Sequence, residues 1–513
     1  MKLNYKRTIL VGFAFFLISA FWQAYDSTIA LTLTNKFGMS QTWSGVIMAL
    51  DNILALFMLP LFGSLSDKHN GKSGRRTPFI RFGTLVAAIA LVALSFADNY
   101  QLSSLDAVSK VDDPAALEAL YDAQKDSRLM TPDGDEFVLS ETFSREEFTA
   151  IRSDAEGENK DAYVDYVVPA RQAYASQVTD ENPAPLIIFI ALLLIILIAM
   201  ATFRSPAVAL MPDVTMKPLR SKGNAIINLM GTAGGILVLV LGIVFGTSKA
   251  KNALMSYTLF YGTIAAVMVG ALIIFLWKVK EKEWAAQMQS DSIRYGVEEI
   301  PESQETKNTK KLGRGEFISL LLILASIALW YMGYNAVTSK YSVYAPNVLQ
   351  KDYNTTMLLA QGAAIVAYLP AGMVASKLGR KKTILIGVTL LCGSFAAAAL
   401  MDADSPTMLM NVLFMLAGVA WATINVNSFP MVVEMCSGAD VGKYTGFYYT
   451  ASMAAQTVTP MFSGFLMDKM GMTVLFPYAA IFVALAFVTM CLVRHGDAKV
   501  IAKKGLEALD TDD

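Results

Sequence analysis

Between two long apolar runs lies the polar stretch Gly63-Ser-Leu-Ser-Asp67-Lys-His-Asn-Gly-Lys-Ser-Gly74-Arg75-Arg76-Thr-Pro78-Phe79-Ile80. The flanking runs, at about 44–66 and 79–97, are each long enough to cross a bilayer, which takes about 20 residues of α-helix. Short connections rich in Lys and Arg stay on the cytoplasmic side of a membrane. We therefore expect this connection to be cytoplasmic, and it then sets the side of every other connection.

The composition of the whole chain agrees with a membrane protein. Of its 513 residues, 54% are hydrophobic and only 17% are charged, whereas a soluble protein carries about 25% charged residues. Uninterrupted apolar runs favour α-helical spans over the short alternating segments of a β-barrel. The basic clusters sit at the ends of these runs, so we expect the lipid bilayer as a partner and no nucleic acid.

Twelve runs predict twelve transmembrane helices, and the cationic residues gather in every second connection, as the positive-inside rule requires. We expect a multi-pass protein of the plasma (cytoplasmic) membrane with both termini in the cytoplasm. The predicted spans are 8–33, 44–66, 79–97, 185–211, 224–246, 255–277, 315–345, 357–378, 382–400, 407–434, 442–467 and 472–493.

Two long connections divide the chain. Residues 279–314 are polar and read as a cytoplasmic linker between an N-terminal six-helix bundle, 1–278, and a C-terminal one, 315–494; residues 495–513 would be a cytoplasmic tail. Residues 98–184 hold 20 acidic and 7 basic side chains, so we expect an acidic extracytoplasmic insertion. Its aromatic residues could form a small core, and Thr131-Pro-Asp-Gly-Asp-Glu-Phe reads as a turn entering a strand.

The two halves repeat weakly. The motif after the second span has a counterpart after the eighth, Gly372-Met-Val-Ala-Ser-Lys-Leu-Gly379-Arg380. Corresponding motifs six spans apart imply two six-helix bundles related by an axis along the membrane normal, with a solute site at mid-membrane between them. The predicted fold class is therefore an all-α polytopic protein of two pseudo-symmetric bundles.

Gly63-x-x-x-Asp67 … Gly74-Arg75-Arg76 resembles the signature loop of the major facilitator superfamily. Ser66-Asp67 … Gly74-Arg75-Arg76-x-Pro78-Phe79-Ile80 is similar to the pattern of the sucrose-transporter family and of the related glycoside–pentoside–hexuronide:cation symporters. The resemblance implies cation-coupled sugar transport. It also implies a cytoplasmic gate in which Asp67 pairs with a loop arginine, the alternative being a role in topology and anionic-lipid contact alone. The gate residues would be Gly63, Asp67, Gly74, Arg75, Arg76, Asp213, Gly379 and Arg380.

Asp26 and Asp51 are the carboxylates that we place well inside spans. Counting 1.5 Å per residue puts both about 10–12 Å below the outer surface, and the first two spans are antiparallel, so the two carboxylates could approach each other. Neighbouring carboxylates raise each other's proton affinity, and a cation between them relieves the repulsion. With Asn52 as a neutral oxygen ligand, we expect a coupling site for H⁺ or Na⁺; the alternative is an interfacial water pocket or a pairing with a fixed cation. Acids in these two spans are more like the melibiose-type branch, in which such carboxylates bind the coupling cation.

Sugar sites need aromatic faces for the ring and amides for the hydroxyls. Arg204 could contact the solute or serve as counter-ion of an acid such as Asp213, and Lys340 would snorkel to the outer interface. For most single aromatic residues packing is the plainer interpretation. The candidate substrate-binding residues are Trp22, Gln23, Tyr25, Arg204, Asn228, Tyr331, Tyr334, Asn335, Gln361, Trp421 and Asn425.

These patterns together predict a monomeric secondary transporter that moves a glycoside, most simply a disaccharide, with H⁺ or Na⁺ by alternating access. We expect no cofactor and no structural metal, and no nucleophile–base pair or phosphate loop indicates an enzyme. One alternative is a transporter of a non-sugar solute, importing or exporting it. Another is a membrane receptor that uses the 98–184 insertion to recognise a partner.

Overall fold

Twelve helices of 18 or more residues form the body of the protein in the computed structural model, which describes residues 3–153, 161–216, 219–296, 313–433, 435 and 441–495. Each coincides with one of the twelve expected spans to within four residues, except that α3 ends seven residues later than expected. The prediction of twelve long helices is therefore confirmed. They are α1 (Tyr5–Asn35), α2 (Gln41–Lys68), α3 (Thr77–Ser104), α8 (Ala184–Val214), α9 (Arg220–Phe245), α10 (Thr258–Lys278), α12 (Arg314–Tyr344), α13 (Tyr353–Leu378), α14 (Arg380–Ala398), α15 (Thr407–Val433), α16 (Val441–Met470) and α17 (Leu475–Leu492).

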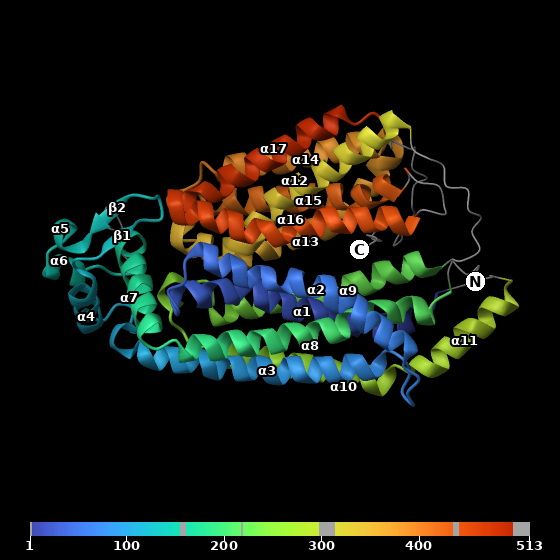
Figure 1. The fold of residues 1–513 in the computed structure, drawn as a ribbon, viewed down its shortest axis with the longest axis horizontal. Helices are drawn as coiled ribbons and strands as arrows, with labels where there is room; N and C mark the ends of the chain where they lie inside the picture. Colours follow the sequence, from blue (N-terminus) through green and yellow to red (C-terminus); the bar gives the residue numbers. More distant parts are fainter. Residues whose placement is uncertain are drawn as a thin grey trace.

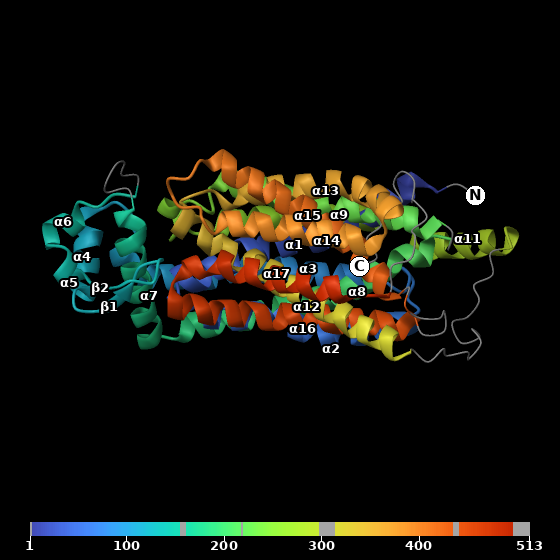
Figure 2. The same cartoon turned by 90° about the horizontal axis from the view of Figure 1, so that it is seen from above.

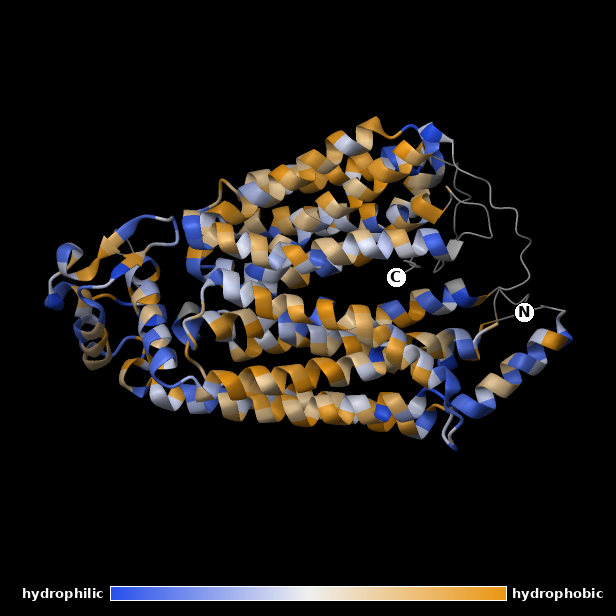
Figure 3. Cartoon of the chain, in the orientation of Figure 1, coloured by the Kyte–Doolittle hydropathy of each residue, from blue (hydrophilic) through white to orange (hydrophobic). Residues whose placement is uncertain are grey.

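The helices run side by side along the long axis of the molecule (Figure 1). Within the described residues, ten of them are long and apolar enough to cross a membrane, and α13 and α16 extend alongside these ten over a similar height. Hydrophobic residues cover the middle of the bundle and hydrophilic ones gather at its two ends (Figure 3). This distribution is that of a multi-pass membrane protein.

The helices pack as two groups. One apolar core is built by α1, α3, α8 and α10, and another by α12, α14, α15 and α17. The two groups lie against each other along α1, α2, α9, α12, α13 and α16 (Figure 1). Seen from above, the C-terminal group lies over the N-terminal one (Figure 2). Of the expected linker, residues 281–294 form α11 (Glu281–Arg294), which packs against α8; residues 297–312 and the expected tail beyond His495 lie outside the described residues.

A small unit projects from one end of the bundle (Figure 1). We call residues 105–183 the cap, the end that bears it the cap end, and the opposite end, where α1 begins and α17 ends, the terminal end. The cap comprises α4 (Pro114–Gln124), β1 (Arg128–Met130), β2 (Glu136–Val138), α5 (Leu139–Thr142), α6 (Arg145–Thr149) and α7 (Val168–Glu181).

The expected turn in the cap is a two-stranded hairpin in which Leu129 faces Phe137 across the antiparallel ladder. Gly134 closes the turn with a φ of +98°, a left-handed conformation that glycine adopts without a Cβ clash. The aromatic core expected from the sequence is present: Phe148 and Tyr163 are buried, and other aromatic side chains, among them Phe137, pack against them.

One buried ion pair was not expected. Asp98 belongs to α3, inside the helix and not in the connection after it, and is completely buried. Lys36, just past the end of α1, donates to both of its carboxylate oxygens at 2.6 and 2.8 Å and to the carbonyl oxygen of Met255 at 2.7 Å. A buried charge is tolerated only when it is paired and hydrogen-bonded, and this pair therefore ties α1 to α3 and to the start of α10.

Candidate functional site

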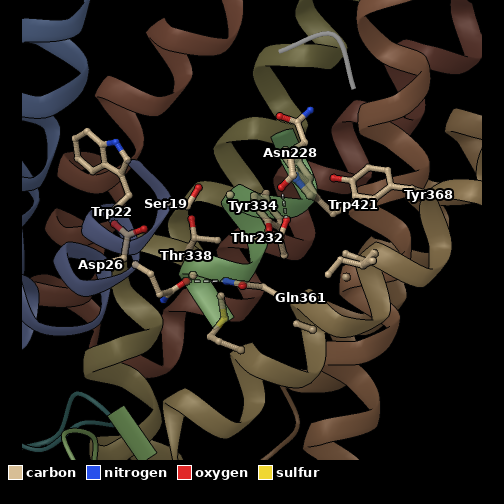
Figure 4. Close-up of a pocket in the computed structure, with 18 of the residues that line it drawn as sticks. Ser19, Trp22, Asp26, Asn228, Thr232, Tyr334, Thr338, Gln361, Tyr368 and Trp421 are labelled. Atoms are coloured by element: carbon tan, nitrogen blue, oxygen red, sulfur yellow. Dashed lines mark hydrogen bonds between the residues drawn. The ribbon is translucent and has the colours of Figure 1, made fainter. Parts of the chain in front are cut away.

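A cavity of about 460 Å³ lies between the two groups of helices. Its wall is built by α1, α8 and α9 on one side and by α12, α13 and α15 on the other (Figure 4). Seven of the predicted substrate-binding residues line it, namely Trp22, Gln23, Arg204, Asn228, Tyr334, Gln361 and Trp421. The internal repeat predicts a solute site between the two halves, and most of these side chains line a cavity there.

Two aromatic rings form a flat platform on this wall. Tyr334 of α12 and Trp421 of α15 stack with their ring centroids 3.6 Å apart and their planes 5° from parallel. Tyr331 packs edge-on against Trp421, with centroids 5.1 Å apart, and its hydroxyl lies 3.4 Å from that of Tyr448. Tyr331 therefore supports the platform from behind and is not among the residues that line the cavity.

Amide groups from both halves meet beside the platform. Gln361 of α13 donates through Nε2 to Oε1 of Gln23 of α1 at 2.6 Å, the contact drawn in Figure 4. Gln23 in turn donates to the Ser27 hydroxyl at 3.2 Å and to the Tyr353 hydroxyl at 3.4 Å. Gly235 of α9 faces this pair and leaves room for it, since a Cβ there would lie 3.4 Å from Oε1 of Gln361.

A second cavity, of about 200 Å³, adjoins the first and is lined by Asp26, Asp51 and Asn52. Asn52 donates to Oδ1 of Asp51 at 2.8 Å. The predicted proximity of the two carboxylates is met, because the depth count along antiparallel helices placed them at the same level. Tyr25 and Asn335, proposed above as substrate ligands, line this cavity and not the larger one.

The two cavities share a wall made of Trp22, Asp26, Arg204 and Thr338. The Arg204 guanidinium lies 5.8 Å from the Trp22 ring centroid and interacts electrostatically with Asp51. Asp213, nine residues further along α8 and thus about 13 Å away along the helix axis, is bound instead by Arg76 and Arg75. The acid near Arg204 is therefore Asp51 of the second cavity and not Asp213.

Some assignments differ from the sequence-based ones. Asn425 lines neither cavity. Four polar residues of the central cavity are absent from the list of candidate substrate-binding residues given above: Ser19, Thr232, Thr338 and Tyr368. A helical spacing of three or four residues could have found the first three, because Ser19 precedes Trp22, Thr232 follows Asn228 and Thr338 follows Tyr334 on the same helix face.

The signature loop forms an ion-pair cluster at the terminal end. Arg76 binds Asp67 through Nη2 at 2.5 Å and Asp213 through Nε at 2.8 Å, and Arg75 reaches Asp213 at 3.3 Å. Gly63 lets α2 approach α8 here, since a Cβ would lie 2.8 Å from the Ser205 hydroxyl. These contacts all join elements of the N-terminal half, so in this structure they brace that half and do not bridge to the other.

Glu281 of α11 completes this cluster, and sequence reasoning missed it. Its buried carboxylate accepts hydrogen bonds from the backbone N–H groups of Arg75, Arg76 and Thr77 at 2.6–2.8 Å and from the Thr77 hydroxyl at 2.7 Å. It thereby caps the first turn of α3. Gly74 adopts a φ of +116°, and a Cβ there would lie 2.3 Å from the Glu281 carboxyl group. The second part of the expected gate belongs to the other half, where Gly379 lies between α13 and α14 and Arg380 is the first residue of α14.

At the cap end the two halves touch directly. Lys340 of α12 is completely buried and donates through Nζ to the carbonyl oxygen of Gln41 at the start of α2, at 2.6 Å. The prediction that Lys340 snorkels to the outer interface is therefore wrong. Its backbone position near the helix end suggested solvent, but the opposing half covers it.

Comparison with known proteins agrees with this architecture. Residues 353–509 match the family model described as Major Facilitator Superfamily. The inward-open xylose transporter XylE from E. coli superposes with a TM-score of 0.59 and 16% sequence identity over 99% of both chains. The C-terminal part of the chain is thus similar to the major facilitator superfamily. The family model covers its C-terminal part, and the superposition extends the major facilitator fold over the whole length.

Two further matches are to other transporters. The peptide transporter POT in complex with sulfate superposes with a TM-score of 0.60 and 12% identity, over 95% of this chain and 93% of that one. The MFS-type transporter ppzB of Metarhizium rileyi is 26% identical over 149 residues. That stretch spans 29% of this chain and about a third, 30%, of the relative's length. Identities this low show the major facilitator fold and leave the solute open.

Proposed function

We propose that this chain is a secondary active transporter that couples the movement of H⁺ or Na⁺ to that of a glycoside, most simply a disaccharide. One observation carries the proposal: the cavity that holds Asp26 and Asp51 shares a wall with the central cavity. A cation in the smaller space and a solute in the larger one would touch the same side chains. Each would then change the affinity for the other, which is what coupling requires.

The central cavity suits a sugar. Its volume of about 460 Å³ falls within the range of about 300–1,000 Å³ that is usual for small-molecule sites. The stacked Tyr334 and Trp421 offer an apolar face for a pyranose ring. Gln23, Gln361 and Asn228 supply amides for its hydroxyls, and the buried indole N–H of Trp22 has no hydrogen-bond partner among the residues that the structure describes.

The smaller cavity suits a monovalent cation. Asp26 and Asp51 bring two carboxylates, and the one guanidinium on the wall, that of Arg204, leaves a deficit of one positive charge among these three groups. A charge at membrane depth costs several kcal/mol unless it is compensated. A proton shared by the carboxylates, or a sodium ion ligated by them and by the Asn52 amide oxygen, would supply the missing charge.

The transport cycle proposed here is alternating access between the two halves. The halves touch at the cap end through contacts such as Lys340 to Gln41, so this conformation corresponds to a carrier closed on that side. With the positively charged terminal end in the cytoplasm, the cap would face outward and both termini inward. We further propose that the transporter works as a monomer in the plasma membrane.

The test uses purified protein in liposomes with an imposed pH or sodium gradient. Uptake of labelled mono- and disaccharides is measured for the wild type, for Asp26→Asn, for Asp51→Asn, and for Asp106→Asn as a control on the exposed surface of the cap. We expect gradient-driven accumulation to disappear in the two cavity variants and to persist in the control. Unchanged accumulation in both cavity variants would refute the coupling role.

A solute that carries a carboxylate is the second candidate, because Arg204 lines the central cavity as well. Guanidinium groups bind carboxylates through charge-assisted hydrogen bonds. A counterflow panel that includes hexuronides and dipeptides beside neutral disaccharides separates the two. Counterflow with acidic solutes alone, abolished by Arg204→Gln, would favour this candidate.

A further inference from the structure

At the cap end, the start of α2 is capped by a residue of the other half. Asp468, near the end of α16, accepts hydrogen bonds from the backbone N–H groups of Gln41 and Thr42, both at 2.7 Å, and from the Thr42 hydroxyl at 2.5 Å. The first N–H groups of a helix have no partner within it, and a carboxylate there is favoured by the helix dipole. The helix's own N-cap residue, Ser40, accepts from the backbone N–H of Trp43, at 3.3 Å, so the carboxylate that serves Gln41 and Thr42 comes from across the interface.

A buried cation lies on the same spot. Lys340 of α12 donates to the carbonyl oxygen of Gln41 at 2.6 Å, and the carboxylate that acts on it electrostatically is that of Asp468. The backbones around these groups are in contact: a Cβ at Gly464 of α16 would lie 2.2 Å from the Gln41 carbonyl oxygen. Separation of the halves here would take the Gln41 carbonyl oxygen from Lys340, and the N–H groups of Gln41 and Thr42 from Asp468, at once.

The pseudo-equivalent contact, between α9 and α13, is built differently. Helix α13 carries its own capping residue, Asp352, which accepts from the backbone N–H of Thr355 at 2.9 Å. The groups that the described residues of the other half contribute are neutral: the Ser248 hydroxyl donates to Asp352, and the Thr247 hydroxyl accepts from Asn354 at 3.0 Å. Separation on this side leaves the cap of the helix intact. Of the two contacts, the one at Asp468 therefore contributes more to holding the halves together.

The cap grips the chain just after Asp468. The carbonyl oxygen of Pro132, in the hairpin turn, accepts from the backbone N–H of Met472 at 2.6 Å. Gly471 has a φ of +90°, and a Cβ there would lie 2.6 Å from the backbone nitrogen of Gly134. The cap itself belongs to the N-terminal half, since α7 holds the end of α1 through a hydrogen bond from Gln172 to Asn35 at 2.9 Å. The hairpin therefore bridges the two halves directly above Asp468.

We propose that Asp468, with Lys340, is the gating residue at the cap end, and that the hairpin of the cap latches this gate shut. The inference rests on the proposed transport cycle, in which this side must open. Opening breaks the contacts of Asp468 to α2 and of Pro132 and Gly134 to residues 470–473. The cap then stays with the N-terminal half, to which it is joined at both of its ends through α3 and α8.

The experiment measures the opening itself and needs no solute. Spin labels are placed on the exposed residues Tyr100 of α3 and Leu400 after α14, in a background without native cysteines, and their distance distribution is recorded in lipid nanodiscs. We expect Asp468→Asn to raise the ratio of open to closed populations at least about tenfold, the effect of weakening one charge-assisted hydrogen bond. Asp402→Asn is the matched control, because Asp402 accepts from a backbone N–H and a hydroxyl of Ser405 within one half.

A second pair of variants tests the latch. Gly471→Ala places a methyl group against the hairpin and should also raise the open population, whereas Gly296→Ala imposes the same type of strain, at a φ of +65°, with nothing within 4 Å. If Asp468→Asn fails to fold, Thr42→Val removes a single donor and should give a smaller shift in the same direction.

The outcomes separate the gate from the transport cycle. A wild type that populates two distances, with neither Asp468→Asn nor Thr42→Val shifting them, overturns the gate and leaves the transport proposal standing. A two-distance wild type that Asp468→Asn shifts but Gly471→Ala does not overturns the latch alone. A single distance in every variant, whatever the pH, sodium or sugar added, overturns the alternating access on which both rest.

Discussion

Removal of the Glu281 carboxylate should destabilise the N-terminal half measurably. In Glu281→Ala, the backbone N–H groups of Arg75, Arg76 and Thr77, at the start of α3, lose the carboxylate that they share. Loss of a helix cap costs about 1 kcal/mol, and loss of a partly buried anion at a helix N-terminus costs up to about 2 kcal/mol. The sum is about 3 kcal/mol, which for a unit of some 200 residues lowers the melting temperature by roughly 6–12 °C.

The assay is thermal unfolding in detergent, followed by tryptophan fluorescence, together with amide hydrogen exchange over residues 74–80. Glu283→Ala is the matched control: it lies on the same first turn of α11, but its side chain is 69% exposed and its partner is Lys280, three residues away. Exposed pairs of this kind contribute about 0–1 kcal/mol. A melting temperature for Glu281→Ala within 1 °C of that of Glu283→Ala would refute the assignment of Glu281 as the cap of α3.

Three further predictions follow from other sites. Lys36→Met leaves Asp98 buried without its ammonium partner and should cost about 3–5 kcal/mol of stability, part of which Lys36→Met/Asp98→Asn restores in a melting assay. Burial, with Asp161 and Asp133 nearby, raises the pKa of Asp165 in the cap to about 6. The protonated carboxyl group therefore stabilises the cap fully below pH 4, and this stabilisation, about 1 kcal/mol after allowance for solvent screening, is lost as the pH rises through 6. Hydrogen exchange of residues 163–167 measures the loss. Trp421→Ala removes half of the stacked platform and should weaken solute binding about tenfold in calorimetry.

Each of these has its own control. Equal melting of the single and double variants would contradict the ion-pair argument for Lys36. Asp165→Asn should flatten the pH dependence of exchange, and an unchanged profile would contradict the role of that carboxyl group. Trp277→Ala, at a position 72% exposed on the outer surface of α10, should leave solute affinity unchanged.

The sequence was sufficient for the helices because length and hydropathy determine a membrane span almost alone. It also brought Asp26 and Asp51 to one cavity, since residue counts along antiparallel helices give depth directly. The sequence could not show toward which side of its helix each residue points. Tyr331 and Tyr334, three residues apart, both looked like ligands, yet one forms the platform and the other supports it from behind.

The sequence also could not predict which charged groups contact residues far away along the chain. Nothing in the sequence links Glu281 to residues 75–77, because the carboxylate acts on backbone N–H groups that leave no side-chain pattern. Lys340 and Asp468 lie 299 and 427 residues away from Gln41 along the chain, and they contact it only because the halves close at the cap end. Such contacts belong to the packing of whole elements, and hydropathy says nothing about them.

A solute in the central cavity would compete with the hydrogen bond between Gln361 and Gln23, which joins the two halves. The two amides join the halves across the central cavity at 2.6 Å, and they are the groups best suited to grasp sugar hydroxyls. An arriving hydroxyl can replace either amide at little enthalpic cost, because one neutral hydrogen bond is exchanged for another. In the empty carrier the two amides would thus bind each other, and in the loaded carrier they would bind the solute and no longer join the two halves.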